Sequence, residues 1–539
     1  MSRFRILGVV IALGLLAAAC SDSSDDTSEA DQTTTAVSET TVADATTTEA
    51  PQQTTTAPPE TTEVAAITVG LQLEPATLDP TASPEGPIQT VELYNLIETL
   101  IKLGPTGEFE PLLAESWDVS DDGLTYTFNL RQGVVFHDGA SFGADDVVFS
   151  LDRARDEANG HPFGSQLAVV DTVTALDDST VEVVLSKFSA NFLFNMAQSV
   201  GMIFDEASVD SLADAPVGTG PYAFSEWVRG DSITVVANPD YWGDAPLLDS
   251  ITYRYIPDAN ALNNAILAGD IEIIAGVSAP ELLEVFQDDP AFDVQVGTTN
   301  GEVTMALNNR TDALSDVRVR QALSFAIDRQ AVIDGAYFGY GEIIGTFAVP
   351  TDPYYVDLTD VYAYDPDKAL ALLEEAGWAE GLELTFKLPP PSYARRSGEI
   401  IQSQLSEVGV DVTIENVEWP VWLEDVFNVE GVEGAFNYDL SIVAHVEPRD
   451  IGQYGNPDYY FGYDNPDVQA ELAAADAEAD DATRYAELGD VQRQITADAA
   501  SIWLFVLPNL AVTVEGIGGF SPNSVTQALD MTNVSYNPS

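Results

Sequence analysis

The sequence predicts an α/β protein whose folded part forms two lobes. The chain has 539 residues, of which 45% are hydrophobic, enough apolar side chain to bury a sizeable core. A strand pattern followed by a loop and a helix opens the folded part at Ile67–Leu73, and a strand–helix–strand pattern covers 382–417. No second linker-like stretch interrupts residues 64–539. These observations favour two α/β lobes over a string of independent domains.

The first half of the folded part contains strand, hairpin and helix patterns. Asp122-Gly123 favours a tight turn, and the apolar residues alternate from Leu124 to Leu130, as in a half-buried hairpin strand. The expected elements are, in order, a strand at 67–73, a Pro-rich loop at 74–87, a helix at 91–101, a hairpin through 117–130, a helix at 147–155 and a strand at 181–185.

The second half is more helical. Asp316 is a suitable N-cap for a helix with a 3.6-residue period, and Asp365-Pro366 opens another helix that ends before Gly377. The expected elements are helices at 316–327 and 365–376, a strand at 382–388, a helix at 400–408, strands at 410–417 and 440–443, a helical segment at 468–500 and a strand at 502–507.

The first 63 residues differ from the rest. Arg3 and Arg5 precede a short apolar run, and small residues lead to Cys20, the only cysteine of the chain. This arrangement resembles a bacterial lipoprotein signal at 1–20, in which Cys20 becomes the lipidated first residue; the alternative is an ordinary secretory signal. Residues 21–63 are rich in Ser, Thr and acidic residues and contain no Lys, Arg or aromatic residue, which predicts a disordered tether.

The charge of the chain excludes one large class of partners. With 20 basic and 88 acidic residues, the formal net charge is −68. A polyanion is repelled by nucleic acid, so no nucleic-acid partner is expected. Because most of the acidic residues lie beyond the tether, the charge indicates a solvated surface on an exported module. The lipoprotein-like signal implies that this module lies outside the cell, held at its membrane by a lipid on Cys20.

Several strings together resemble the family 5 extracellular solute-binding proteins of ABC importers, which bind peptides, nickel or oligosaccharides. Six or more strings in one order are far more specific than any single string. They are DGLTYTFNLR at 122–131, GVVFHDG at 133–139, GTGPY at 218–222, NPDYWG at 238–243, AGDIEI at 268–273, DVRVRQA at 316–322, AIDR at 326–329 and YDPDKA at 364–369.

The resemblance implies a two-lobed, periplasmic-binding-protein-like fold of type II, cluster C, with an extra subdomain inserted in the first lobe. Lobe one is expected at 64–296 plus 504–539, and lobe two at 297–503. The hairpin and His137 would lie in the inserted subdomain, away from the cleft. The implied protein is a monomer without cofactor, metal or catalytic residues, which captures a peptide or other small solute and delivers it to a permease and ATPase complex.

The motifs themselves are interpreted as structural. Gly218, Gly220 and Pro221 set a tight turn rather than a phosphate loop, since no Lys or Ser/Thr follows at the required spacing. Arg318 and Arg320 are expected to pair with carboxylates on helix faces.

Lobe two concentrates the expected ligand contacts. Aromatic residues gather between 419 and 463, and the strand at 440–443 should deliver polar side chains at its carboxyl end, the usual binding edge of an α/β sheet. Similar peptide binders carry a Trp and then an Asp here, whereas this chain has His445 and displaced acids, which argues against a standard dipeptide. The predicted lobe-two contacts are Trp419, Trp422, His445, Glu447, Arg449, Asp450, Tyr454 and Tyr460.

Further contacts are expected outside this segment. Arg395 and Arg396 precede a predicted helix and could receive a carboxylate, although a structural ion pair is an equal alternative. In lobe one, Glu74 and Thr77 belong to the loop after the first strand, and Asn308 is placed at a strand end near the hinge. The mixture of Arg and acidic residues favours a zwitterionic or polar solute.

Other functions remain as alternatives. His445 with Glu447 supplies only two metal ligands, so a metal would be held mainly by its own chelator, as in nickel-type binders. An oligosaccharide is a further candidate solute. The alternative of an extracellular hydrolase has little support, because the sequence contains no nucleophile-elbow motif and only three His. A ligand sensor with the same lobes fits the sequence as well as an importer component does.

Overall fold

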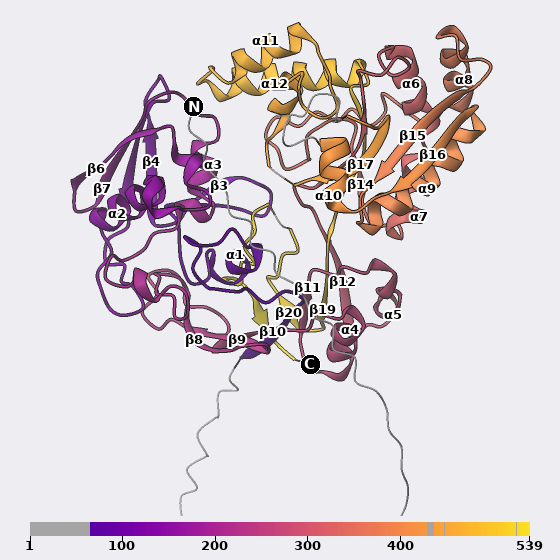
Figure 1. The fold of residues 1–539 in the computed structure, drawn as a ribbon. Coiled ribbons are helices and arrows are strands. Elements are labelled where there is room, and N and C mark those ends of the chain that lie inside the picture. The colour runs from indigo at the N-terminus through magenta and orange to yellow at the C-terminus, as the bar shows by residue number, and fades with distance from the viewer. Residues whose placement is uncertain (1–64, 428–435, 447, 524, 539) are drawn as a thin grey trace, which may run out of the picture. The chain divides into compact units, whose positions relative to one another are not determined.

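The computed structural model describes residues 65–427, 436–446, 448–523 and 525–538, and all of them belong to one compact unit, Glu63–Ser539. Three sheets of four or more strands organise this unit (Figure 1). Two of them form the cores of lobe one and lobe two, and the third belongs to the inserted subdomain. Among the described residues, no helix is both long and apolar enough to cross a membrane.

The sheet of lobe one has seven strands in the order β12-β19-β11-β1-β10-β9-β8. Its central strand β1 runs parallel to β10 and β11, and the remaining neighbours are antiparallel. Strands from both ends of the chain therefore share one sheet. The bounds are β1 Ala66–Leu71, β8 Tyr222–Val228, β9 Ser232–Ala237, β10 Ser250–Tyr255, β11 Ile273–Ala275, β12 Phe292–Gly297 and β19 Asn509–Val514.

The sheet of lobe two has six strands in the order β14-β18-β13-β17-β15-β16. Strands β15 and β16 are parallel and joined by helix α9 (Ser392–Glu407), which confirms the strand–helix–strand prediction for 382–417. The helix begins eight residues before the predicted start at 400. The bounds of the strands are β13 Glu302–Leu307, β14 Glu342–Ile343, β15 Leu382–Leu388, β16 Val410–Asn416, β17 Leu440–His445 and β18 Ser501–Val506.

The inserted subdomain has its own sheet and its own core. Strands β4 (Ala114–Val119) and β5 (Thr125–Leu130) form the predicted hairpin, and the sheet order is β4-β5-β7-β6. Helix α2 (Ala144–Arg155) packs on β6 (Val170–Asp177) and β7 (Thr180–Leu185). Phe128, Val147 and Val181 are fully buried members of this separate core.

Helices and short elements complete the unit. The predicted helices at 316–327 and 365–376 are confirmed as α6 and α8, and the segment at 468–500 forms two helices, α11 and α12. The bounds are α1 Gly86–Glu92, α3 Phe192–Met196, α4 Ala259–Ala268, α5 Glu284–Gln287, α6 Val317–Ala326, α7 Arg329–Tyr337, α8 Pro366–Glu375, α10 Trp419–Trp422, α11 Pro466–Ala475 and α12 Asp481–Ala497, with small strands β2 Ile101–Leu103, β3 Phe109–Pro111, β20 Ile517–Gly518 and β21 Ser535–Tyr536.

Two crossings connect the lobes. The chain leaves β12 at Gly297 and enters β13 at Glu302, and it returns from β18 at Val506 to β19 at Asn509. The crossings bond to each other, because Thr299 Oγ1 donates to the Leu507 carbonyl at 2.6 Å and the Leu507 amide donates to the Gly301 carbonyl at 2.7 Å. We call residues 298–301 and 507–508 the hinge. Strand β18 extends to 506 in the lobe-two sheet, beyond the expected boundary after 503.

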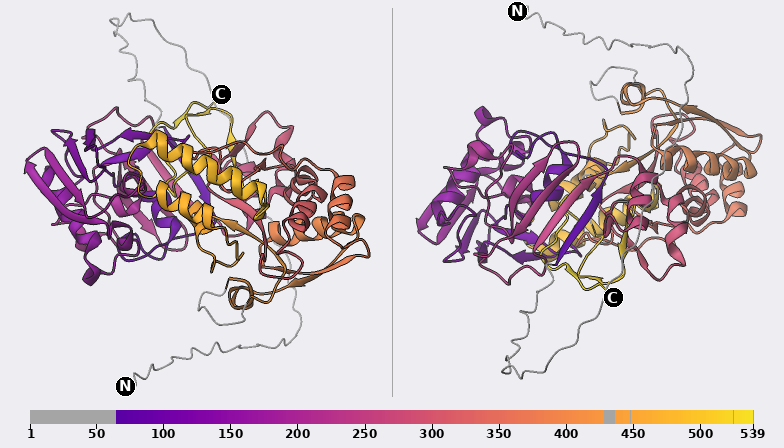
Figure 2. Two further views of the ribbon diagram at one scale, coloured as in Figure 1. Left: turned by 90° about the horizontal axis from the view of Figure 1, so that it is seen from above. Right: turned by 90° about the horizontal axis from the view of Figure 1, so that it is seen from below.

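The inserted subdomain also lies beside the helical edge of lobe two. Helices α11 and α12, yellow-orange in Figure 2, approach the purple subdomain. A Cβ placed on Gly123 would lie 3.3 Å from the Cβ of Ala479, and the Arg484 guanidinium stands 5.4 Å from the Phe188 ring centroid. The two lobes therefore have contacts on the subdomain side as well as at the hinge.

The predicted helix at 91–101 is wrong. Helix α1 ends at Glu92, and Tyr94 adopts a positive φ of 69° that breaks any continuation. The Leu96 carbonyl, which a helix would have used, instead accepts from the Gly220 amide at 2.9 Å. Bonds from a segment more than a hundred residues away thus replace the local helical bonds.

The glycines of the GTGPY string serve close packing. A Cβ on Gly218 would lie 2.0 Å from the Leu96 carbonyl oxygen, and one on Gly220 would lie 2.3 Å from that of Asn95. The ring of His137 contacts the same turn, with Nε2 at 3.0 Å from the Gly220 carbonyl oxygen. This geometry confirms the structural interpretation of the string over a phosphate loop.

A buried carboxylate ties these strings together. Glu98 accepts from Thr219 Oγ1 at 2.8 Å, Tyr241 OH at 3.0 Å and Trp242 Nε1 at 2.9 Å. Burial raises the pKa of Glu98 to about 7 in spite of these donors. The GTGPY and NPDYWG strings therefore meet at one proton-binding side chain in the core of the molecule.

We predict that Glu98 makes the folding stability fall as pH rises. Its folded pKa of about 7 exceeds its ordinary value of 4.5, so the folded protein binds the proton more tightly than the unfolded chain. The contribution of Glu98 to the free energy of unfolding should decrease by roughly 3 kcal/mol as pH rises from 4.5 through 7. Glu98→Gln should flatten this dependence in urea titrations, whereas the exposed Glu226→Gln should leave it unchanged. Equal pH slopes for Glu98→Gln and the wild type would contradict the assignment.

Candidate functional site

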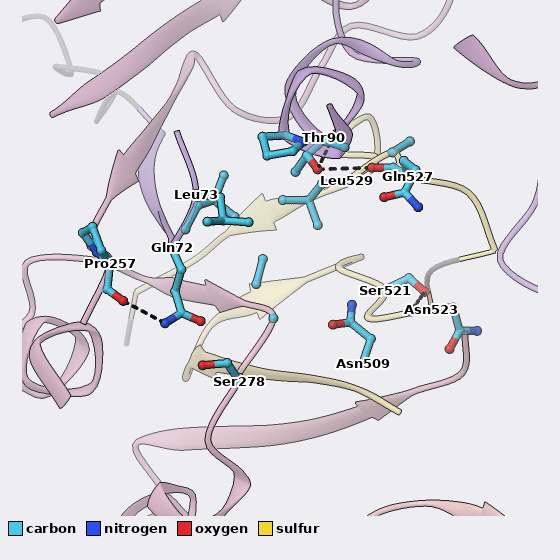
Figure 3. A pocket seen from close by; sticks show the side chains of 16 residues that line it. Gln72, Leu73, Thr90, Pro257, Ser278, Asn509, Ser521, Asn523, Gln527 and Leu529 are labelled. Atoms are coloured by element: carbon cyan, nitrogen blue, oxygen red, sulfur yellow. Dashed lines mark hydrogen bonds between the residues drawn. The ribbon is translucent and has the colours of Figure 1, made fainter. Parts of the chain in front are cut away.

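One candidate site is a hollow of about 760 Å³ in lobe one (Figure 3). Its volume falls in the range of pockets that hold small organic ligands. Side chains and backbone from six stretches of the chain line it: Leu71, Gln72, Leu73, Gly86, Pro87, Thr90, Pro257, Ala275, Gly276, Ser278, Asn509, Ser521, Asn523, Gln527, Ala528 and Leu529.

Sheet topology places the hollow at the carboxyl ends of parallel strands. Strands β1, β10 and β11 run in the same direction, so Gln72, Pro257 and Ser278, which follow them, share one edge. Asn509 begins the antiparallel β19 and reaches the same edge from the other direction. The hollow therefore occupies the edge at which open α/β sheets bind ligands.

The polar side chains of the lining donate hydrogen bonds to backbone carbonyls rather than to one another. Gln72 Nε2 donates to the Pro257 carbonyl at 3.1 Å, and Asn509 Nδ2 donates to the Pro522 carbonyl at 2.9 Å. Thr90 Oγ1 donates to the backbone carbonyl of Gln527 at 3.3 Å. Figure 3 shows Gln72 and Asn509 on opposite sides of the hollow, with Gln527 on a third side.

The hollow adjoins the hinge. Asn523, which lines it, accepts the Thr298 amide on its Oδ1 at 3.1 Å, and Asn300 Nδ2 donates to the Val525 carbonyl at 3.0 Å. Gly297 packs so closely on this segment that a Cβ there would lie 2.2 Å from the Pro522 carbonyl oxygen. A solute in the hollow would thus contact a segment that bonds directly to the first crossing.

The two lobe-one residues predicted from the sequence are engaged elsewhere. Glu74 Oε1 accepts from Trp227 Nε1 at 2.9 Å and from the Gly230 amide at 2.8 Å. Thr77 Oγ1 accepts the Asp79 amide at 3.1 Å. Neither residue lines the hollow, although their neighbours Gln72 and Leu73 do.

His445, the last residue of β17, is buried in lobe two. Its Nε2 lies 2.9 Å from the hydroxyl of Tyr460, and its Nδ1 lies 3.7 Å from Asp450 Oδ2. The rings of His445 and Tyr460 are nearly parallel, and Phe347 meets His445 edge-on. Three predicted contacts therefore form one packed row, in which only 5% of the His445 side chain is exposed.

The predicted aromatic wall is mainly core. Trp422 is 3% exposed and donates its Nε1 proton to Ser441 Oγ at 2.9 Å, and Tyr454 is fully buried beside Trp503. Trp419 is 40% exposed and covers Trp422 edge-on, with ring centroids 5.4 Å apart. Of these predicted residues, only Trp419 offers a broad ring surface to a solute.

The two predicted arginines of α9 bind protein groups. Arg395 donates to the carbonyls of Pro389 and Val417 at 3.2 and 3.3 Å and lies 3.5 Å from Glu418. Arg396 lies 3.3 Å from Glu281 of lobe one. Both arginines therefore form ion pairs within the protein, which was the alternative to a ligand contact, and the pair of Arg396 connects the two lobes.

Asn308 lies far from the hinge, contrary to the prediction. It follows Leu307, which pairs with Leu440, whereas the hinge adjoins Glu302, which pairs with His445 at the other end of the same two strands. Its Nδ2 donates to the Tyr438 carbonyl at 2.9 Å, and the residue is 2% exposed. The direction of β13 in the sheet, which no local pattern reveals, decides this placement.

Arg449 extends from lobe two to the inserted subdomain. It has a positive φ of 60°, and its guanidinium lies 4.6 Å from the Phe194 ring centroid and 5.6 Å from that of Phe109. Arg449 and Asp450 line a smaller cavity of about 320 Å³ there. Glu447, also predicted as a contact, lies outside the described residues.

Sequence reasoning missed the amides and hydroxyls of the hollow. Ser521, Asn523 and Gln527 belong to a C-terminal stretch without a motif, and Ser278 stands in a loop. The position after a buried strand could have identified Gln72 and Ser278, but the C-terminal residues carry no comparable signal. Within the described ranges, no group of three or more His, Cys, Asp and Glu could hold a metal ion.

Comparison with known proteins identifies the family. The model of the bacterial extracellular solute-binding proteins, family 5 middle, matches residues 108–465. The chain belongs to this family. A heme-binding protein A of Haemophilus influenzae is 31% identical over 68% of this chain and 70% of its own, and a dipeptide-binding protein of Escherichia coli is 32% identical over 62% and 68%.

A solved structure with 26% sequence identity agrees with the fold. The PBP AgaA from A. tumefaciens R10 in complex with agropinic acid is 26% identical, with a TM-score of 0.66 over 88% of this chain and 99% of that chain. The names of these three proteins record three chemically different ligands. Family membership therefore establishes solute binding and a two-lobed fold but does not select the solute.

We predict that burial separates the effects of the two tryptophans on stability. Trp422→Ala should lower the free energy of unfolding by about 3–5 kcal/mol, because it leaves a cavity and removes the donor to Ser441. Trp419→Ala should cost less than about 1 kcal/mol, because the ring is already partly solvated. Urea denaturation measures both values. Similar losses for the two variants would contradict the distinction between core and surface.

Proposed function

We propose that this protein is the lipid-anchored substrate-binding component of an ABC importer. It captures an oligopeptide-like or other polar organic solute by closure of its two lobes and delivers it to a permease and ATPase complex. The observation that carries the proposal is the hollow at the carboxyl edge of the lobe-one sheet, directly beside the hinge.

The hinge gives a physical route for closure. Of the residues that the structure describes, only 298–301 and 507–508 cross between the two large sheets, so a change of a few dihedral angles there can move one lobe against the other. A solute that contacts both lobes binds the closed form more tightly than the open form, and this difference in affinity shifts the population toward closure. The exposed face of Trp419 is the proposed lobe-two contact.

Contacts between the lobes support a defined closing movement. On the hinge side, Gln287 Nε2 of lobe one donates to the Tyr340 hydroxyl of lobe two at 2.6 Å, and Arg396 pairs with Glu281. On the subdomain side, Arg449 stands between Phe109 and Phe194. Polar and cation–π contacts of this kind are individually weak, so they can be exchanged during closure at small cost.

Native mass spectrometry of the full chain purified from its own organism tests solute binding. We expect a retained small molecule, and we expect its return to the stripped protein to raise the melting temperature, because ligand binds only the folded state. Small-angle scattering should show a smaller radius of gyration with the solute bound. Absence of a retained molecule, together with no thermal shift across peptides, sugars and metal chelates, would contradict the proposed function.

Lipid anchoring is tested at Cys20. Cys20→Ser removes the only thiol of the chain, so this variant should incorporate no radiolabelled palmitate and should leave the membrane fraction. Ser21→Ala, which keeps the thiol, is the matched control and should remain lipidated. Retention of Cys20→Ser in the membrane fraction would contradict the anchor.

A further inference from the structure

We propose that the lobe-one hollow takes an electrically neutral solute that forms several hydrogen bonds through groups such as peptide amides or sugar hydroxyls. This inference rests on the proposed function and specifies its substrate class. The expectation from the sequence was a zwitterionic or polar solute. The structure favours a neutral solute, because no charged residue lines the hollow and the predicted cations of lobe two already bind protein groups.

The lining of the hollow contrasts with the rest of the molecule. None of the described residues that line it is Asp, Glu, Lys, Arg or His, although the chain contains 88 acidic residues. The polar lining groups are amides and hydroxyls, including those of Gln72, Thr90, Ser278 and Asn509, set among Leu, Pro and Ala side chains. Such a lining offers both donors and acceptors without net charge.

Several of these groups retain hydrogen-bonding capacity. The contacts of Gln72 and Asn509 use only their side-chain nitrogens, which leaves the Oε1 and Oδ1 atoms as acceptors facing the hollow (Figure 3). Among the described residues, the side-chain amide of Gln527 and the hydroxyl of Ser278 have no hydrogen-bond partner. Together they can pair with the N–H and C=O groups of a peptide backbone or with hydroxyl groups.

A charged group in this hollow would lose hydration without an opposite charge in return. An ionised carboxylate would find no Arg or Lys in the lining and would also face the field of a strongly acidic protein. An ammonium group would find no carboxylate there. A neutral group exchanges water for the lining amides and hydroxyls, so its desolvation cost is compensated.

The charged side chains of lobe two do not supply the missing partner. Arg395 is held by two backbone carbonyls and Glu418, Arg396 pairs with Glu281, and Arg449 lies over two phenylalanine rings. Lys387 is 5% exposed and pairs with Asp425 at 2.5 Å. These engaged cations cannot receive a solute carboxylate without losing existing contacts.

Matched neutral and charged probes test the inference in the full chain. Calorimetry would compare N-acetyl-trialanine amide with free trialanine, and maltotriose with its counterpart that ends in glucuronic acid. We expect the neutral member of the binding pair to bind at least about tenfold more tightly, because the charged member has an uncompensated desolvation cost. Whether the peptide pair or the sugar pair binds shows which of the two chemistries the solute has.

A variant tests whether the neutrality of the hollow itself causes this preference. Gln527→Glu adds one negative charge to the lining without breaking a side-chain hydrogen bond among the described residues, and it should weaken the neutral probe severalfold. Gln295→Glu, on β12 and outside the lining, is the matched control and should bind as the wild type does. Unchanged binding by Gln527→Glu would overturn the placement of the neutral group.

The outcomes separate this inference from the proposed function. Tighter binding of a charged probe would overturn the neutral class and leave solute binding intact. The same conclusion would follow if native mass spectrometry showed a retained charged molecule whose charge is required for binding. A retained neutral molecule would support the class even if neither probe pair binds. Failure of every solute to bind would overturn the proposed function and this inference with it.

Discussion

The constraint on which the rest of the structure depends is the paired crossing between the two large sheets. Thr299, Gly301 and Leu507 bond to one another, so the two connecting segments act as one narrow link. Because β12 and β19 are neighbours in one sheet, and β13 and β18 are neighbours in the other, each lobe is fixed to this link by ladder hydrogen bonds. The position of the hollow beside it follows from this topology.

Local sequence signals predicted those parts of the fold that are stabilised locally. The hairpin around Asp122-Gly123 and the parallel unit β15–α9–β16 depend on turn residues and periodicity, and both were found. The helix expected at 91–101 failed because Gly220 bonds to the Leu96 carbonyl. That contact requires two backbone segments to approach so closely that only glycine fits. The hydrophobic periodicity of a sequence does not reveal such an approach.

The candidate site was harder to predict than the fold for the same reason. Residue type suggested Trp419, Trp422 and His445 as ligand contacts, but the burial of Trp422 and His445 is set by the packing of Tyr460, Phe347 and the rest of the lobe-two core. The hollow draws Gln72, Ser278 and Gln527 from distant segments. They come together only through the strand order of the lobe-one sheet, so no single stretch of sequence indicates the site.

The shared sheet of lobe one also has a consequence for biogenesis. Strand β1 precedes β19 and the lining residues Ser521, Asn523 and Gln527 by most of the length of the folded region, yet all of them belong to one sheet edge and one hollow. Because a chain is synthesised in sequence order, lobe one stays incomplete, with its hollow unformed, until these late residues are available.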